Sequence, residues 1–160
     1  MPGIDKKDET ILRELRKNGR ITLTELGNKV NLSPASVKSR LEKLEKLGAI
    51  KGYTAIINPT FLNEFIQAII EVELMIDDDR TDKILYRLAE LDHIQSIYRR
   101  TGESQILIRA NFSDVDGVRK FLGELSRRYF GKNMKRAEVT IILDTIKESG
   151  VIISQRKRKR

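Results

Sequence analysis

A run of small polar and basic side chains between residues 33 and 43 is the stretch best suited to binding chemistry. Hydroxyl and methyl groups alternate there with cations, a combination that can contact base edges in a DNA groove and neutralise phosphates. An arginine in such a run can donate two hydrogen bonds to a guanine. The residues that we expect to contact bases are Ser33, Ala35, Ser36, Ser39 and Arg40. The residues that we expect to contact phosphates are Thr24, Lys38, Lys43 and Lys51.

A helix that begins at Ser33 would present these side chains together. Ser33 is a favourable N-cap residue, and Pro34 suits the first helical position because its missing N–H has no partner there. Apolar residues recur along this helix at spacings of four, three and three, which predicts one buried stripe and an outward polar face. The stripe consists of Val37, Leu41, Leu44 and Leu47.

The preceding segment predicts a second, short helix joined to the first by a tight turn. Thr22 and Glu25 fit a capping box, and Asn31 tolerates the left-handed conformation that ends a helix. Two helices joined in this way are typical of a helix-turn-helix, whose second helix enters the DNA major groove. The alternative for this stretch is a helical hairpin with a solvated polar face.

Two flanking elements complete the predicted N-terminal domain. Asp5 and Asp8 fit the capping box of a first helix that runs to about residue 17, and Gly48 is a helix-ending residue. Residues 50–57 are rich in β-branched side chains and predict a strand, which would make the domain a winged helix.

After a linker at 58–64 the pattern changes to four strands and two helices. We expect strands at 65–76, 94–100, 105–111 and 138–145. We expect one helix from about 80 to 91. A second helix should begin at a cap formed by Ser113 and Asp116 and run to about 129. The expected fold class is therefore α+β, with an N-terminal winged helix-turn-helix domain and a C-terminal ferredoxin-like βαββαβ domain. The expected domains are 1–57 for DNA binding, 65–150 for the ferredoxin-like domain and 151–160 for a basic tail.

The predicted strands are apolar on both faces, as in residues 106–108 and 141–143. Two helices can cover only one face of the sheet, so we expect the other face to be buried against a second copy of the chain. A dimer would also suit a helix-turn-helix protein, because two reading helices can span two half-sites.

The charge distribution separates the chain into regions. The net charge is +8, and residues 1–52 carry 12 Lys and Arg against 7 Asp and Glu, whereas residues 53–155 carry 14 against 16. The five residues at 156–160 are all cations, which predicts a nonspecific phosphate contact or solubilising charge. With no cysteine and no long apolar run, we expect a cytoplasmic protein without a membrane segment, metal or cofactor.

The order of these features resembles the leucine-responsive regulatory protein/AsnC family, also called feast/famine regulators. The resemblance covers residues 4 to about 148 and includes both halves in the same order. It rests on Ile4-Asp5, Asp8, Ile11-Leu12, Leu32-Ser33-Pro34, Val37, Arg40-Leu41, Leu44, Leu47-Gly48, Ile50 and Gly52-Tyr53-Thr54. It implies a bacterial or archaeal transcription factor that binds promoter DNA as a dimer, often assembled into octamers, and responds to a small effector, usually an amino acid.

In that family the effector lies between subunits, near the turn that joins the second and third strands. The matching residues here are Thr101, Gly102, Glu103, Ser104 and Gln105, and Thr140 on the last strand could supply a hydroxyl. Gln105 stands where the family commonly has an acidic residue, so we expect a neutral polar or aliphatic amino acid rather than lysine or arginine. Without the resemblance, these residues would be interpreted as an ordinary hairpin turn.

Two other functions are compatible with the sequence. The chain could be a co-regulator or ligand-sensing module that acts through mixed oligomers. Relatives with this architecture also act on tetrapyrroles as decarboxylases, but such an enzyme needs acid and base groups near its ligand. The single histidine, His93, is expected on the surface or at a helix cap, so we expect no enzymatic activity.

Overall fold

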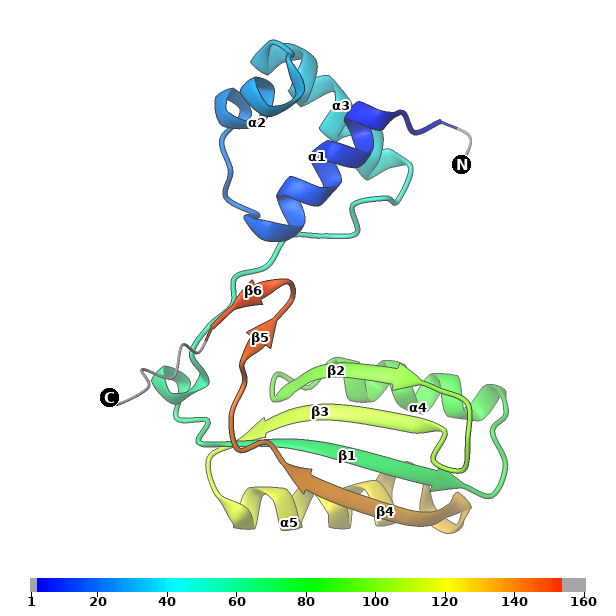
Figure 1. Cartoon of the computed structure of the whole chain (residues 1–160). Helices are drawn as coiled ribbons and strands as arrows, with labels where there is room; N and C mark the ends of the chain where they lie inside the picture. The colour runs from blue at the N-terminus through cyan, green and yellow to red at the C-terminus, as the bar shows by residue number, and fades with distance from the viewer. Residues whose placement is uncertain (1–2, 154–160) are drawn as a thin grey trace. The chain divides into compact units, whose positions relative to one another are not determined.

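The computed structural model describes residues 3–153, which form two compact units (Figure 1). One unit contains the described residues up to Ile57 together with those from Thr145 onward, and the other is Asn58–Asp144. The sequence placed residues 145–150 in the second domain, whereas the structure groups them with the first.

The first unit contains three helices whose starts are fixed by local caps. These are α1 (Lys6–Lys17), α2 (Leu23–Val30) and α3 (Pro34–Lys46). Capping boxes form at Asp5 with Asp8 and at Thr22 with Glu25, and the Ser33 side chain accepts a hydrogen bond from the Ser36 N–H. All three predicted caps are confirmed because each depends only on residues within one helical turn.

Apolar residues from the three helices form one core. Ile11, Leu26, Val37 and Leu44 are fully or almost fully buried. Leu47, which we predicted as the last member of the α3 stripe, is instead 53% exposed. It is the C-cap of α3, and Gly48 follows with a φ of 68°, so the chain turns away from the core there.

The segment after α3 differs from the prediction of a strand at 50–57. Residues 51–58 lie outside helices and strands and are exposed. A strand needs a neighbour to accept and donate its backbone hydrogen bonds, and no such neighbour accompanies this segment within residues 3–153. A short 3₁₀ turn, η1 (Pro59–Leu62), then occupies the predicted linker.

The second unit has the predicted βαββαβ order. Its elements are β1 (Ile66–Leu74), α4 (Asp79–Ala89), β2 (Ile94–Arg99), β3 (Ile106–Phe112), α5 (Val115–Glu124) and β4 (Met134–Ile141). The four strands form one antiparallel sheet in the order β2-β3-β1-β4. The π-helical turn η2 (Leu125–Tyr129) prolongs α5 to the predicted end of that helix, and the 3₁₀ turn η3 (Gly131–Asn133) follows it.

Two boundaries in this unit differ from the prediction. The cap of α5 is Asp114, which accepts a hydrogen bond from the Gly117 N–H at 2.7 Å, while the Ser113 hydroxyl donates to Asp114. A carboxylate is the stronger acceptor and also favours the positive end of the helix dipole, so it displaces the serine. The last strand lies earlier than predicted because its register on β1 begins with Met134 opposite Leu74.

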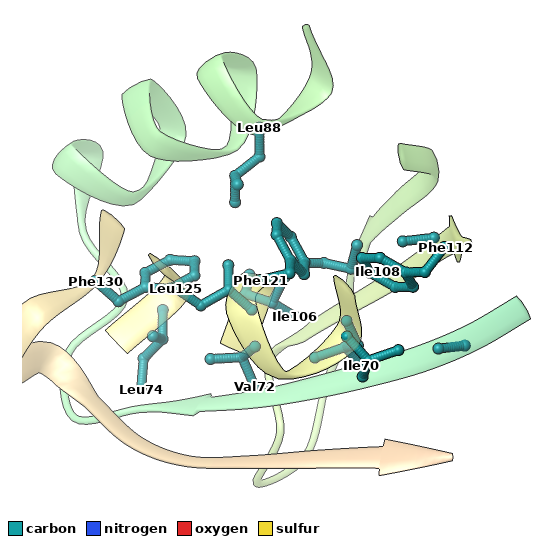
Figure 2. Packing of buried hydrophobic residues seen from close by; sticks show 13 residues of the cluster. Ile70, Val72, Leu74, Leu88, Ile106, Ile108, Phe112, Phe121, Leu125 and Phe130 are labelled. Atoms are coloured by element: carbon teal, nitrogen blue, oxygen red, sulfur yellow. The ribbon is translucent and has the colours of Figure 1, made fainter. Parts of the chain in front are cut away.

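The core of the second unit lies between the sheet and its two helices (Figure 2). Alternate residues of β1 and β3 point toward Leu88 of α4 and Phe121 of α5. The inward strand residues include Ile70, Val72, Leu74, Ile106, Ile108 and Phe112.

The opposite face of the sheet is less apolar than we predicted. Its central pairs are Ile69 with Arg109 and Glu71 with Leu107, so charged residues alternate with apolar ones. Glu73 lies beside Arg136 of β4 on the same face. Apolar side chains therefore occupy only part of this surface.

A C-terminal hairpin was not predicted. It consists of β5 (Lys147–Glu148) and β6 (Val151–Ile152), with Gly150 at a φ of 90° between them. A Cβ on Gly150 would lie 3.0 Å from the Arg16 carbonyl oxygen, so the hairpin packs closely on α1. The predicted basic tail at 151–160 therefore begins inside this hairpin, because 151–152 form β6, and residues 154–160 lie outside the described residues.

Candidate nucleic-acid interface and effector site

The first turn of α3 is exposed and built from small side chains. Ser33, Ala35, Ser36 and Ser39 are all exposed, as predicted for residues that approach base edges. The Ser33 and Ser36 hydroxyls lie 2.9 Å apart, and the Ser36 N–H donates to the Ser33 hydroxyl at 3.2 Å. This cap holds the first turn in one conformation while leaving its outer face uncovered.

Farther along α3, Glu42 and Lys46 lie on the same outward face as Ala35 and Ser39. The four residues are spaced by four, three and four positions, and all are exposed. Neither Glu42 nor Lys46 was predicted from the sequence, although their helical spacing could have identified them. A carboxylate at this position can accept a hydrogen bond from cytosine, and a lysine can contact phosphate.

The residues predicted to contact phosphate do not share one environment. Thr24 on α2, Lys38 on α3 and Lys51 after α3 are exposed. Lys51 lies in the segment 51–58, which is outside helices and strands, so the described residues contain no wing strand there. The Lys43 ammonium, in contrast, donates to a carboxylate oxygen of Asp8 at 3.1 Å.

Arg40 also has carboxylate partners within the chain. Its Nη1 donates to Asp8 at 2.6 Å and to Asp5 at 2.7 Å, so the guanidinium faces the start of α1. These two hydrogen bonds raise the pKa of Arg40. Both hydrogens of this Nη1 are therefore used within the fold.

Asp8 is the buried centre of this group. Its side chain is fully buried, and burial opposes its ionisation, but hydrogen bonds from Arg40, from the Asp5 N–H and from Lys43 outweigh that effect and lower its pKa. The carboxylate therefore remains charged, with each oxygen occupied by donors.

The predicted effector turn follows β2. Thr101, Gly102 and Glu103 are exposed, and the Gly102 φ of 106° needs a glycine. The Arg100 Nε donates to the Ser104 carbonyl at 2.6 Å, and the Arg100 N–H donates to the Gln105 carbonyl at 2.8 Å. Both ends of the turn are therefore fixed by Arg100.

Gln105 has a structural contact that the sequence did not indicate. Its Oε1 accepts a hydrogen bond from the Leu74 N–H at 2.8 Å. The backbone pairing of β1 with β3 ends at Val72 and Ile106, so this side chain continues the ladder beyond the last pair. The side-chain amide oxygen of Gln105 is thus already engaged in holding the end of β1.

Arg100 and Glu71 form an ion pair beside the turn. This pair was not predicted from the sequence. The guanidinium contacts both carboxylate oxygens of Glu71, at 3.0 and 2.8 Å. The hydrogen bonds from Arg100 lower the pKa of Glu71, and those to Glu71 raise the pKa of Arg100. The two residues are far apart in sequence, so no local signal links them.

Thr140 is not brought to this turn within one chain. It pairs with Ile69, whereas the end of β1 nearest the turn pairs with residues around Ala137. Three residues of strand separate these positions by about 10 Å, and β1 lies between β4 and β3. The structure therefore divides the predicted effector residues into the turn and a distant hydroxyl.

His93 is half-buried and packs against two aromatic side chains, rather than lying at the predicted surface or cap position. Its ring lies 5.4 Å from that of Phe112 and 5.0 Å from that of Phe121. Burial lowers its pKa, and its Nε2 is buried without a hydrogen-bond partner among the described residues. The lowered pKa favours the neutral imidazole, which packs against the rings of Phe112 and Phe121.

Comparison with protein families divides the chain in the same order. A winged helix-turn-helix DNA-binding family matches residues 4–51, and the Lrp/AsnC ligand binding domain matches residues 67–152. Across residues 3–153, no helix is both long and apolar enough to cross a membrane.

Several relatives are similar over almost the whole chain. An uncharacterized HTH-type transcriptional regulator of Pyrococcus furiosus is 51% identical over 96% of this chain and 99% of its own length. The leucine-responsive regulatory protein of Escherichia coli is 33% identical over 95% of this chain and 93% of its own. A transcriptional regulator of Neisseria meningitidis, solved in complex with L-methionine, is 30% identical with a TM-score of 0.76, covering 91% of this chain and 93% of its own.

Proposed function

Because the chain belongs to the Lrp/AsnC family of transcriptional regulators, we propose that it binds promoter DNA through the outer face of α3 and that an amino acid bound to its second unit controls this binding. The observation that carries the DNA-binding part is the exposed, capped first turn of α3. Small side chains allow the helix backbone to approach the groove closely, and the cap fixes the direction from which the hydroxyls meet the bases.

The proposed contacts follow from exposure. Ser33, Ala35, Ser36 and Ser39 meet base edges, and Lys38, Lys46, Lys51 and Thr24 meet phosphates. The positive charge of the N-terminal region supplies the attraction to DNA that does not depend on sequence.

We further propose that the protein acts as a homodimer, or as a higher oligomer such as an octamer built from dimers. Ile69 and Leu107 place apolar area on the uncovered sheet face, and a second copy can bury it. Two copies would present two α3 helices to a pseudo-palindromic site, with half-sites about 34 Å apart or a multiple of that distance.

The proposed effector is an amino acid with a neutral polar or aliphatic side chain, held at residues 101–105. Gly102 leaves room for a ligand to approach the backbone, and turn N–H groups can bind a carboxylate. Gln105 carries no charge that could bind a cationic side chain. The Neisseria meningitidis relative was solved with L-methionine, an amino acid of this class.

The DNA-binding proposal can be tested with Ser39→Glu and a matched variant, Ser126→Glu, which adds the same charge at an exposed position of the second unit. DNA selected from random sequence by the wild-type protein would serve as the probe. We expect Ser39→Glu to lose about tenfold or more in affinity, equivalent to about 1.4 kcal/mol, and Ser126→Glu to bind like the wild type. Equal affinities for both variants would contradict the assignment of α3.

The effector proposal can be tested by measuring thermal unfolding with each of the twenty amino acids. A ligand at 100 times its dissociation constant stabilises the protein by about 2.7 kcal/mol if it binds only the folded state. We expect neutral amino acids to raise the unfolding temperature and Gly102→Val to abolish the effect. Stabilisation by lysine or arginine alone would contradict the proposed ligand class.

A further inference from the structure

The ion pairs between α1 and α3 involve two of the cations that a DNA-reading helix would be expected to use. Arg40 and Lys43 lie one helical turn apart, and both donate to Asp8 of α1. Arg40 also donates to Asp5. The two cations therefore face the start of α1 instead of extending from α3.

We propose that Asp8 is a positioning residue that holds Arg40 and Lys43 away from DNA and so sets how strongly the protein distinguishes its own site from other DNA. The inference rests on the proposed DNA-binding function of α3. Asp8 touches no DNA in this proposal; it acts through the two side chains that it holds.

The charge balance of the group supports this role. Asp5 and Asp8 supply two negative charges, and Arg40 and Lys43 supply two positive charges, so the group is neutral as a whole. Nonspecific affinity depends on the number of phosphates that cations neutralise. Two neutralised cations on the reading helix reduce this affinity without removing the side chains that meet base edges.

The geometry also fixes the orientation of α3. The Asp8 carboxylate is fully buried and accepts hydrogen bonds from Arg40 at 2.6 Å, from Lys43 at 3.1 Å and from the Asp5 N–H at 3.2 Å. It thus connects the N-terminal cap of α1 with the middle of α3. Ser33 and Ser36 lie at the first turn of the same helix and Ser39 in the next, so their direction depends on this connection.

The first test is Asp8→Asn, which keeps the shape of the side chain and removes its charge. Affinity for selected DNA and for random DNA would be measured at several salt concentrations with the full-length protein. We expect binding to random DNA to tighten and the ratio of specific to nonspecific affinity to fall about tenfold. The slope of log affinity against log salt concentration should steepen by about one or two, because each released cation that reaches a phosphate adds about 0.9 to it.

Glu14→Gln is the matched control. Glu14 also lies on α1 and pairs with two lysines, Lys17 and Lys29, but neither belongs to α3. The control variant raises the net charge by the same amount but releases no cation of α3. It should therefore leave the salt dependence and the specificity ratio near those of the wild type. If Asp8→Asn and Glu14→Gln behave alike, the inference is wrong.

Lys43→Gln tests the same inference without altering a buried group. A lysine held by Asp8 contributes no phosphate contact, so its removal should leave the salt dependence unchanged. A salt dependence that becomes shallower by about one would show that Lys43 contacts a phosphate and would overturn the inference. If the wild-type protein itself selects no DNA sequence, the proposed function fails; if only the variants deviate from expectation, the inference alone fails.

Discussion

Replacing Gly27 by alanine is expected to destabilise the DNA-binding unit, although the same replacement in a helix usually stabilises a protein. Gly27 lies in α2, where alanine is favoured over glycine by about 1 kcal/mol. A Cβ at this position, however, would lie 2.5 Å from the carbonyl oxygen of Leu32. Real Cβ atoms do not approach backbone oxygen so closely, so the turn between α2 and α3 must move.

The magnitude follows from the two opposing contributions. Overpacking costs about 1–3 kcal/mol. The Leu32 N–H donates to the Gly27 carbonyl at 3.0 Å, and a weakened hydrogen bond costs about 1 kcal/mol more. After subtraction of the helix preference, we expect Gly27→Ala to lower the free energy of unfolding by about 1–3 kcal/mol.

Gly123→Ala is the matched control because Gly123 also lies within a helix, α5. Its Cβ would meet only the end of the Arg127 side chain, which can move at little cost. We expect this replacement to raise the free energy of unfolding by up to about 1 kcal/mol. Urea unfolding followed by circular dichroism would measure both changes, and hydrogen exchange at the Leu32 amide would assign the loss to the turn. Stabilisation by Gly27→Ala to the same degree as Gly123→Ala would refute the reasoning.

Three further predictions concern other parts of the chain. Gln105→Leu should lower the stability of the second unit by about 1–3 kcal/mol in urea unfolding, because the Leu74 N–H loses its acceptor, whereas Gln105→Glu keeps an acceptor and should lose less. Burial lowers the folded-state pKa of His93, so the unfolded state binds the proton more readily. The contribution of His93 to stability should be constant above about pH 6.5 and should fall as the pH drops below that value. His93→Gln should remove this part of the pH dependence. Deleting residues 156–160 should weaken binding to all DNA and make the salt dependence shallower without altering the footprint, and a changed footprint would contradict this.

Elements whose boundaries depend on neighbouring residues could be predicted from the sequence. The caps at Asp5, Thr22 and Ser33 formed as expected because each satisfies backbone groups within one turn. Asn31 has the predicted left-handed conformation, with a φ of 51°. The βαββαβ order was also predictable, since the change from helical to strand periodicity lies in the sequence itself.

Elements that need a distant partner could not be placed in this way. The extended residues 51–57 have strand composition, but a strand forms only where a neighbour pairs with it, and the described chain offers none there. The hairpin of β5 and β6 has only two residues in each strand, too few for a periodic pattern. The packing of His93 could not be predicted from its neighbours in sequence, because the rings that contact it belong to Phe112 and Phe121, on a strand and a helix farther along the chain.

The sequence by itself determined the family, the order of the two folds and the reading helix with its capped, small-residue first turn. The tertiary structure alone decided which partners the expected binding residues have within the chain. Arg40 and Lys43 look like DNA contacts in sequence, but Asp8 lies 32 and 35 residues away and takes both in the fold. Gln105 was predicted from the sequence as an effector ligand, and in the fold its side-chain amide oxygen accepts a hydrogen bond from the end of β1. A residue type defines what a side chain can bind, whereas only the fold defines which hydrogen-bond partners lie within its reach in the chain.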